Sequence, residues 1–157
     1  MSGMVLAPLN MPDLVYVSER MRDWDRREIF ACRWSDGPEE FARDILALPG
    51  FGWIAGRDGK AIAAIGATEY APGVWSVWMF ATDDFKSIRI GMTKLARRVI
   101  IPTMLSLGMR RAECRSMDGH TDAQQWLEAL GAHREATHKA MGKGGEDFHC
   151  YALIPEI

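Results

Sequence analysis

Residues 74–93 read VWSVWMFATDDFKSIRIGMT, and this stretch decides the fold that the chain is expected to adopt. Val74 to Phe80 is a short apolar run with the length of a strand. From Lys86 to Leu107 apolar residues recur at helical spacing, which predicts a long helix that Pro102 kinks or ends. Because unpaired amides at a helix start attract anions, the turn between this strand and this helix is the first candidate for a binding site.

Two more strands are expected directly before this stretch, at Phe51 to Gly56 and at Ala61 to Thr68. Asp58-Gly59 lies between them and is typical of a tight hairpin turn, because glycine adopts positive φ without steric strain. Pro72-Gly73 marks the next reversal of the chain. The three strands therefore follow one another as an antiparallel group.

Helices are expected in the region before the strands. Residues 1–12 form a first edge strand or an N-terminal arm, since Pro8 cannot donate a hydrogen bond to a central strand. From Leu14 to Trp34 apolar residues recur at mostly helical spacing, and the charged cluster Arg22 to Glu28 is predicted to break this region into two helices. A third helix is expected from Pro38 to about Leu48.

A strand, a helix and a hairpin are expected after the long helix. Met109 to Met117 alternates apolar and charged residues in the manner of a strand. Thr121 or Asp122 can cap the next helix, and Gly131 ends it in the left-handed conformation. The two final strands are expected at about Ala132 to Ala140 and Phe148 to Ile154.

The composition predicts one domain that spans residues 1–157. Hydrophobic residues make up 48% of the chain, which is enough for a core without metal or disulfide support. Nineteen basic and twenty-one acidic residues give a net charge of -2, which disfavours nucleic acid or an anionic membrane as the partner. No apolar run reaches the roughly 20 residues of a membrane span, and the start lacks the features of a signal peptide, so a cytoplasmic location is expected.

The cysteines and histidines predict no metal centre. Cys32, Cys114 and Cys150 are odd in number, widely spaced and set in apolar runs, which favours reduced, buried thiols over disulfides or zinc ligands. The four histidines are scattered, and no Ser-His-Asp or Cys-His pattern of a nucleophilic enzyme can be singled out.

The predicted order of elements, together with Ala123 to Ala132 (AQQWLEALGA), resembles the GNAT (Gcn5-related N-acetyltransferase) superfamily. This segment is similar to the family's penultimate helix and the Leu-Gly ending that follows it. The resemblance covers nearly the whole chain and implies an α/β fold with a mixed central sheet. The pattern is closest to the small GNAT-like proteins of T7-like tailed phages, which are internal virion proteins or proteins of unknown function.

The resemblance implies that acetyl-CoA lies between two parallel strands, here Val74 to Phe80 and Met109 to Met117. The family's phosphate-binding turn places Lys86 at its basic position, Arg89 at its first glycine and Gly91 at its second glycine. The residues that the resemblance implies for acetyl-CoA are Phe80, Ala81, Lys86, Ile88, Arg89, Ile90, Gly91, Met92 and His120.

Three positions depart from the family pattern around this site. The Arg89 guanidinium could bond a phosphate, or its stem could fill the space that the phosphates need, and arginine adopts positive φ only at a cost. His120 stands where an asparagine is usual, and it is either a hydrogen-bond donor or a solvent-exposed loop residue. Leu127 replaces the tyrosine that protonates the leaving thiolate in many members.

Acetyl transfer needs a base for the acceptor amine and a donor for the developing oxyanion. Glu69 and Glu113 are the acids expected nearest the opening, and Tyr151 on the last strand could reach its floor. The alternative for the two acids is a plain surface carboxylate, and the alternative for the tyrosine is ordinary packing. The acceptor amine is not identified by the sequence.

Two functions stay open at this stage. One is an acetyl-CoA-dependent N-acyltransferase of the host cell cytoplasm. The other is a catalytically degenerate, phage-encoded member that works in the virion through contacts with a virion or host protein or with copies of itself. Trp75 and Trp78 alternate on one strand, so a sheet covered on one face would leave one indole for a ligand or a partner, whereas helices on both faces would cover both.

Overall fold

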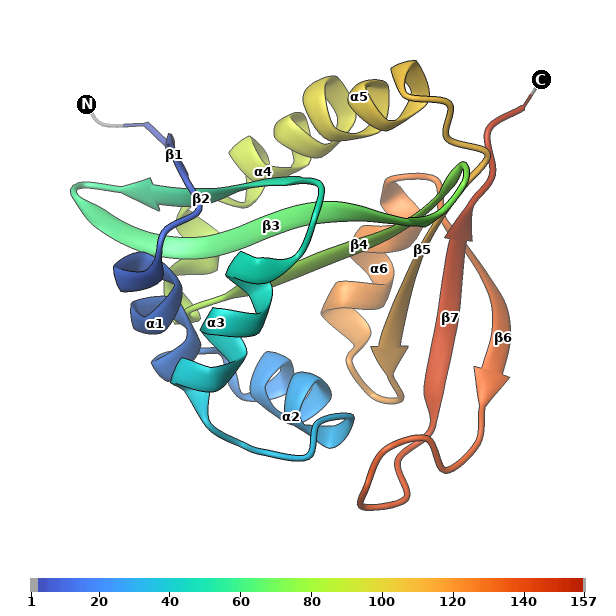
Figure 1. Cartoon of the computed structure of the whole chain (residues 1–157), viewed down its shortest axis with the longest axis horizontal. Helices are drawn as coiled ribbons and strands as arrows, with labels where there is room; N and C mark the ends of the chain where they lie inside the picture. Colours follow the sequence, from blue (N-terminus) through green and yellow to red (C-terminus); the bar gives the residue numbers. More distant parts are fainter. Residues whose placement is uncertain (1–2, 157) are drawn as a thin grey trace.

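A seven-stranded mixed sheet runs through the molecule, and helices cover both of its faces (Figure 1). The computed structural model describes residues 3–156. The strand order is β1-β2-β3-β4-β5-β7-β6, and β4 with β5 is the parallel pair among antiparallel neighbours. The strands are β1 (Val5–Pro8), β2 (Phe51–Arg57), β3 (Lys60–Ala71), β4 (Val74–Ala81), β5 (Arg111–Met117), β6 (His133–His138) and β7 (Phe148–Leu153). This α/β architecture with a mixed sheet confirms the predicted fold class, and β1 is the predicted edge strand.

Three helices follow β1: α1 (Met11–Glu19), α2 (Asp23–Ala31) and α3 (Pro38–Ala47). The prediction that Arg22 to Glu28 breaks the helical region is wrong, because all but the first of these residues lie inside α2. Asp23 and Asp25 lie in the first turn of α2, where carboxylates stabilise the positive end of the helix dipole. The break falls earlier, where Met21 pairs with Thr82 at the end of β4.

The long helix has three parts: α4 (Arg89–Leu95), a wider π-helical turn (Ala96–Ile100) and α5 (Ile101–Ser106). It starts three residues later than predicted, because a tighter 3₁₀ turn covers Asp83–Ser87. Pro102 does not end it. The Ile101 amide donates to the Ala96 carbonyl in the wider turn. This wider turn lets the helix continue although Pro102 has no N–H to donate.

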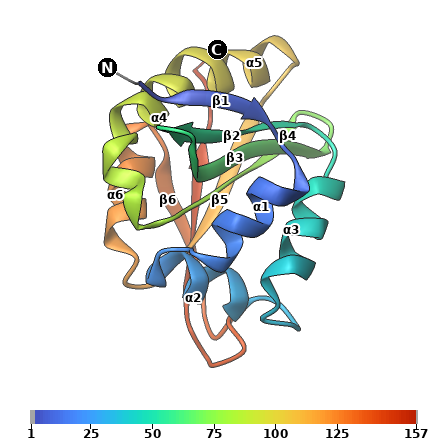
Figure 2. The ribbon, with the colours of Figure 1, turned by 90° about the vertical axis from the view of Figure 1, so that its left-hand side faces the viewer.

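Helices lie on both sides of the sheet (Figure 2), and each side holds one of the two larger apolar cores. Helices α4, α5 and α6 (Thr121–Ala129) lie on one side, where Trp75 is 4% exposed. Helices α1 and α3 lie on the other side, where Phe80 is buried and Trp78 is partly buried. Both faces of the sheet are therefore covered, which was the simpler of the two alternatives for the tryptophans. No helix within residues 3–156 is long and apolar enough to cross a membrane.

The parallel strands β4 and β5 pair only at one end. Val74 to Ser76 pair with Arg111 to Glu113, and beyond this point the two strands diverge (Figure 1). We refer to the paired part as the closed end and to the diverging part, near Ala81 and Met117, as the open end. The amides that face the gap at the open end have no neighbouring strand to bond, so other parts of the chain must satisfy them.

The N-cap of helix α6 lies one residue before the first of the two predicted caps, Thr121 and Asp122. This residue is His120, which makes no side-chain capping bond, because its ring is engaged elsewhere. Gly131 ends the helix with φ +102°, as predicted.

Candidate active site

Helix α2 bridges the open end of the two parallel strands. The Ala81 amide at the end of β4 donates to Asp25 Oδ2 at 2.9 Å, and the Met117 amide at the end of β5 donates to Glu28 Oε2 at 2.9 Å. Because Asp25 and Glu28 are three residues apart, they lie on one face of the helix. One helix face therefore replaces the hydrogen bonds that the diverging strands cannot make to each other.

His120 connects the two acids of α2. Its Nδ1 lies 2.8 Å from Glu28 Oε2, and its Nε2 lies 3.5 Å from Asp25 Oδ1. The ring is 3% exposed and stacks on Trp24 with 5.7 Å between ring centroids. Gly119 has φ +94°, and a Cβ there would lie 2.7 Å from the Trp24 ring, so the turn requires glycine. The prediction of an exposed loop histidine is wrong.

Opposing electrostatic effects act on the pKa of the Asp25 carboxyl group. Burial raises the pKa of its carboxyl group, while the Arg22 guanidinium, then His120 and the Ala81 amide act to lower it. Arg22 donates from Nε and Nη2 at 2.9 and 3.0 Å, and its own amide donates to the Ala81 carbonyl at 2.8 Å. Asp25 and Arg22 thus fasten α2 to β4, and neither carboxylate oxygen of Asp25 faces open solvent.

Glu28 keeps one oxygen free. Its Oε2 accepts from the Ser116 hydroxyl at 3.1 Å, from the Met117 amide and from His120. Within residues 3–156 the structure records no hydrogen bond to Oε1. A carboxylate that is fixed through one oxygen and open at the other can accept a proton from a group beside it.

Two clefts lie at the open end and share one lining residue. The α6 cleft, of about 630 Å³, is lined from the starts of α2, α4 and α6. The α3 cleft, of about 280 Å³, lies on the opposite face of the sheet and is lined from α2, α3, β4 and β5. Met79 on β4 lines both of them. The charged or titratable residues of the α6 cleft are Arg22, Asp23, Asp83, Lys86, Arg89, His120 and Asp122, and those of the α3 cleft are Glu28, Cys32, Arg33, Cys114 and Arg115.

Three of the nine predicted cofactor residues line the α6 cleft: Lys86, Arg89 and His120. Helical spacing explains why the neighbouring residues Ile88, Ile90 and Met92 do not line this cleft. Ile88 and Met92 are 2% and 0% exposed in the core, and Ile90 points to solvent at 74% exposure. Only one side of the helix start can face the cleft.

Gly91 and Arg89 have different roles from those that the phosphate-binding pattern implies. A Cβ at Gly91 would come within 3.0–3.3 Å of the Met4 side chain, so this glycine makes room for the segment before β1. Arg89 is the first residue of α4 and has no positive φ, so the predicted backbone strain does not arise. Its side chain and that of Lys86 make no ion pair or hydrogen bond within residues 3–156.

The backbone of Ala81 is not free for a ligand, because Asp25 and Arg22 occupy its amide and carbonyl. Phe80 is 1% exposed, and its side chain borders the α3 cleft instead of the α6 cleft. The Thr82 amide bonds the Ile62 carbonyl of β3, and backbone groups alternate along a strand. The N–H and C=O of Met79 therefore point to the same gap as those of Ala81.

The three predicted catalytic residues lie outside both clefts. Glu69 accepts from the Gly73 amide at 3.1 Å in the turn at the closed end. Glu113 accepts from the Tyr70 hydroxyl and from Arg111 Nε, and these two donors hold the pKa of Glu113 below its usual range. Tyr151 is 1% exposed, and its hydroxyl accepts from Arg134 at 3.0 Å. Glu113 and Tyr151 line the same small apolar cavity under α6, Glu69 does not, and none of the three lies at the open end.

Asp25 and Glu28 are the site residues that sequence reasoning missed. They lie in the charged cluster that was interpreted as a break between helices. The available signal was their spacing of three residues at a helix start, which places two acids on one face. Leu127, in the position where a tyrosine is usual, lines a small apolar cavity under α6 together with Tyr151.

The surroundings of the three thiols disfavour the thiolate form that a nucleophile needs. Cys32 is exposed, against the prediction, while Cys150 is buried, and all three cysteines are free. Removal from water raises the pKa of each thiol, that of Cys114 to about 12, so the thiolate is disfavoured. No group of three His, Cys, Asp or Glu side chains that could hold a metal ion was found in the described part of the chain.

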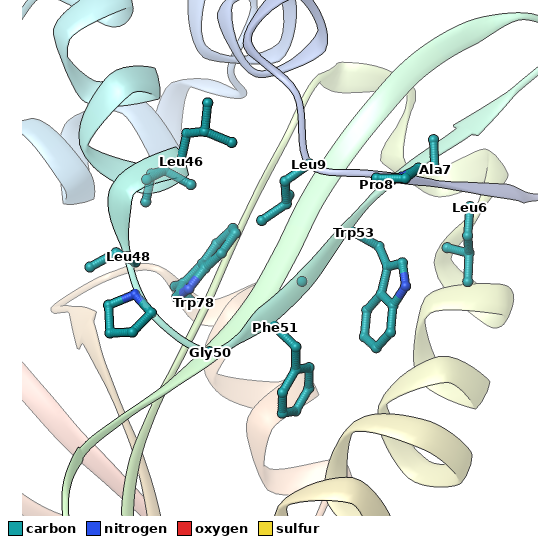
Figure 3. Close-up of a pocket in the computed structure, with 13 residues that line it drawn as sticks. Leu6, Ala7, Pro8, Leu9, Leu46, Leu48, Gly50, Phe51, Trp53 and Trp78 are labelled. Carbon is teal, nitrogen blue, oxygen red and sulfur yellow. The ribbon is translucent and has the colours of Figure 1, made fainter.

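A third hollow, of about 540 Å³, lies at the sheet edge where β1 leaves β2 (Figure 3). Its lining includes Trp53, Trp78, Leu9 and Leu48, and none of its side chains titrates. Figure 3 shows the apolar side chains around it. This hollow therefore cannot supply acid or base chemistry, and the predicted self-association stays a prediction.

Solved structures of acetyltransferases share this fold over nearly the whole chain. An acetyltransferase of the GNAT family from Bacillus anthracis matches with a TM-score of 0.70 and 14% identity, over 96% of this chain and 94% of that one. The ribosomal-protein-S18-alanine N-acetyltransferase from Escherichia coli matches with a TM-score of 0.72 and 15% identity, over 98% and 95%. The protein yncA from Salmonella typhimurium, solved with its cofactor acetyl-CoA, matches with a TM-score of 0.72 and 12% identity, over 99% and 95%.

At these identities the similarity establishes the GNAT fold and nothing finer. No protein-family model and no curated protein matches the chain. These comparisons carry no information on a phage origin or a virion role, so both stay predictions.

Proposed function

We propose that the protein is an acetyl-CoA-dependent N-acyltransferase that uses Glu28 as its base. The observation that carries this proposal is that two clefts share Met79, with uncommitted cations on one side and the free oxygen of Glu28 on the other. The fold it shares with acetyltransferases supports the same reaction class by analogy.

The α6 cleft fits the phosphates of a coenzyme A thioester. Lys86 and Arg89 line it without partners among the described residues. The first amides of α4, those of Arg89, Ile90 and Gly91, have no carbonyl partner within the helix, and such amides bind anions. We assign the phosphates to these side chains and amides. Acetyl-CoA then supplies a thioester carbonyl that an amine can attack.

Met79 is the backbone position that we assign to the thioester. Its N–H points into the gap between β4 and β5, and the residue lines both clefts. A fixed donor aimed at the carbonyl oxygen stabilises the charge that develops on it during attack. The neighbouring amide of Ala81 cannot do this, because it already donates to Asp25.

Glu28 is the proton acceptor in this mechanism. Its Oε1 is open, and the residue lines the α3 cleft, from which an acceptor amine approaches. His120 is a positioning residue, since it holds Oε2 from one side while Asp25 lies behind it. No tyrosine lines either cleft, so the mechanism assigns no phenolic acid to the leaving thiolate.

Calorimetric titration with acetyl-CoA tests the cofactor site. We expect saturable binding by the wild type and binding at least about tenfold weaker in Arg89→Ala, because a charge-assisted bond to phosphate is lost. The matched control is Arg98→Ala, since Arg98 is an exposed cation of the same long helix that lines neither cleft. Absence of binding by the wild type at millimolar acetyl-CoA would contradict the proposal.

The same titration separates this proposal from the alternative that the sequence left open. A virion component without catalysis needs no acetyl-CoA site, so it would show no saturable binding and no heat that depends on Arg89. If the wild type binds acetyl-CoA and the binding depends on Arg89, the result favours the acyltransferase over the degenerate alternative.

A further inference from the structure

The α3 cleft has charges of both signs at separate places on its wall. Glu28 on α2 contributes a carboxylate, and Arg115 on β5 contributes a guanidinium. These two side chains do not form an ion pair with each other. Ile29, Phe41 and Val77 supply apolar wall between them and the interior.

The two arginines that line this cleft differ in whether they have partners within the protein. Arg33 donates to Asp44 at 2.5 Å and lies over the Phe41 ring at 5.1 Å from its centroid. The Arg115 guanidinium makes no ion pair, hydrogen bond or ring contact with any residue in the range 3–156. Arg115 is thus an exposed cation that lines the cleft, and although Glu113 is near enough to interact with it electrostatically, no carboxylate of the described residues forms an ion pair with it.

The size of the cleft limits what can occupy it. Its volume of about 280 Å³ lies at the small end of ligand sites, which run from roughly 300 to 1,000 Å³. A free small molecule fits this space whole, whereas a polypeptide would extend beyond it.

We propose that the acceptor is a free α-amino acid with an apolar side chain, which deepens the function proposed above and rests on it. Its amino group faces Glu28 Oε1, its carboxylate pairs with Arg115, and its side chain packs against Phe41 and Ile29. Attack forms the bond between the amine nitrogen and the acetyl carbon and breaks the carbon–sulfur bond of the thioester. The proton leaves nitrogen for Glu28, and the thiolate of coenzyme A takes one proton from solvent, so the products are an N-acetylamino acid and the free thiol.

Phenylalanine and phenethylamine provide a matched pair of probes, because they share the ring and the amine and differ by the carboxylate. We expect kcat/KM for phenylalanine to exceed that for phenethylamine by about ten- to a hundredfold, the factor that a charge-assisted bond supplies. In Arg115→Gln this ratio falls toward one. The matched control is Arg43→Gln, since Arg43 is an exposed cation of α3 outside the cleft, and it keeps the wild-type ratio.

Calorimetry with phenylalanine alone tests the acceptor site without acetyl-CoA. We expect the wild type to bind and Arg115→Gln to bind at least about tenfold more weakly. Absence of binding by the wild type, or equal binding by the two proteins, overturns the acceptor proposal whatever the cofactor does.

The outcomes separate the two proposals. If phenethylamine or a peptide with a free N-terminus is acetylated with the same kcat/KM as phenylalanine, the acceptor class is wrong and the acyltransferase stands. If acetyl-CoA binds but neither probe is acetylated, the acceptor class is again wrong. If phenylalanine binds through Arg115 and acetyl-CoA does not bind, the acyltransferase fails and the amino-acid site stands.

Discussion

The two ends of the β4–β5 pair contain the same residue types and use them differently. At the closed end Glu113 lies among Tyr70, Arg111 and Glu135, and its pKa is lowered because donors surround it. At the open end the Asp25 carboxyl is buried, and this burial raises its pKa. At the closed end, Glu113 is a stable anion that bonds residues of β3 and β5. At the open end, Asp25 and Glu28 accept hydrogen bonds from strand amides that have no partner strand.

Chemistry can arise in this sheet where its strands diverge. Strands that pair satisfy their own amides, and acids beside them only need counter-ions. Strands that diverge need acceptors from elsewhere, and α2 supplies Asp25 and Glu28. The same divergence opens the two clefts that share Met79. One feature of the fold therefore creates both the ligand space and the buried carboxylates next to it.

We expect the strongest effect from a change of the acid at the open end, measured as the rate of acetyl transfer. Glu28→Gln keeps the size of the side chain and removes the proton acceptor, so acetyl transfer should fall by about 10²- to 10⁴-fold. The matched change at the closed end, Glu113→Gln, should leave the rate within about twofold, because Glu113 touches neither cleft. Release of the coenzyme A thiol measures both rates, and calorimetry should show unchanged acetyl-CoA affinity.

A Glu28→Gln protein that keeps activity within tenfold of the wild type would show that Glu28 is not the base. Loss of activity in Glu113→Gln by a similar factor would remove the functional distinction between the two ends. Circular dichroism checks that each variant keeps the fold, so that a loss of rate reports on chemistry.

The sequence located the elements of the fold because their signals are local. Asp58-Gly59 turns between β2 and β3, Pro38 starts α3 and Gly131 ends α6 within a few residues of where the turn chemistry predicts. The π-helical turn before Pro102 was missed, because it depends on how the helix redistributes its bonds around a missing amide.

The site was only partly predictable, because its decisive contacts are distant in sequence. Asp25 bonds an amide 56 residues away, and Glu28 bonds one 89 residues away. A linear pattern shows these acids as part of a charged cluster and does not show their partners. The position of Lys86 and Arg89 on one cleft wall could be predicted, because the strand-to-helix turn that carries them is continuous in sequence, and their role in binding acetyl-CoA stays a prediction.

The second expected effect concerns stability. Asp25→Ala removes the partner of Arg22 and leaves the buried Ala81 amide without an acceptor, so it should lower the free energy of unfolding by about 3–5 kcal/mol. Asp25→Asn keeps an acceptor for that amide and should lower it less. Glu113→Ala should lower it less than either. Urea unfolding measures the three variants, and an equal loss for Asp25→Ala and Glu113→Ala contradicts the distinction between the ends.

The third effect is a difference in how the two ends respond to acid. The pKa of Glu113 is lowered from its ordinary 4.5, so its contribution to stability is present above that value and is lost as the pH falls through the lowered pKa. The pKa of Asp25 is raised from 3.8, so the folded state binds its proton more readily, and this group favours folding as the pH falls.

Urea unfolding from about pH 6 to about pH 3 tests these opposite signs. Glu113→Gln should make the loss of stability in acid shallower than in the wild type, and Asp25→Asn should make it steeper. Identical slopes for the two variants would mean that the two acids titrate alike, in conflict with their surroundings.

The smallest expected effect tests whether the open end binds phosphates through side chains or through a glycine. At Gly91 an added methyl group meets the flexible Met4 side chain at 3.0–3.3 Å, and alanine favours the helix, so Gly91→Ala should change the free energy of unfolding by less than about 1 kcal/mol. Its acetyl-CoA affinity should stay within about twofold of the wild type, in contrast to Arg89→Ala. A family-type phosphate turn would instead lose affinity when its glycine is filled. Strong weakening in Gly91→Ala would therefore show that the phosphates pack against Gly91 as in the family-type turn, and unchanged binding would show that they lie beside Lys86 and Arg89 without needing the space at Gly91.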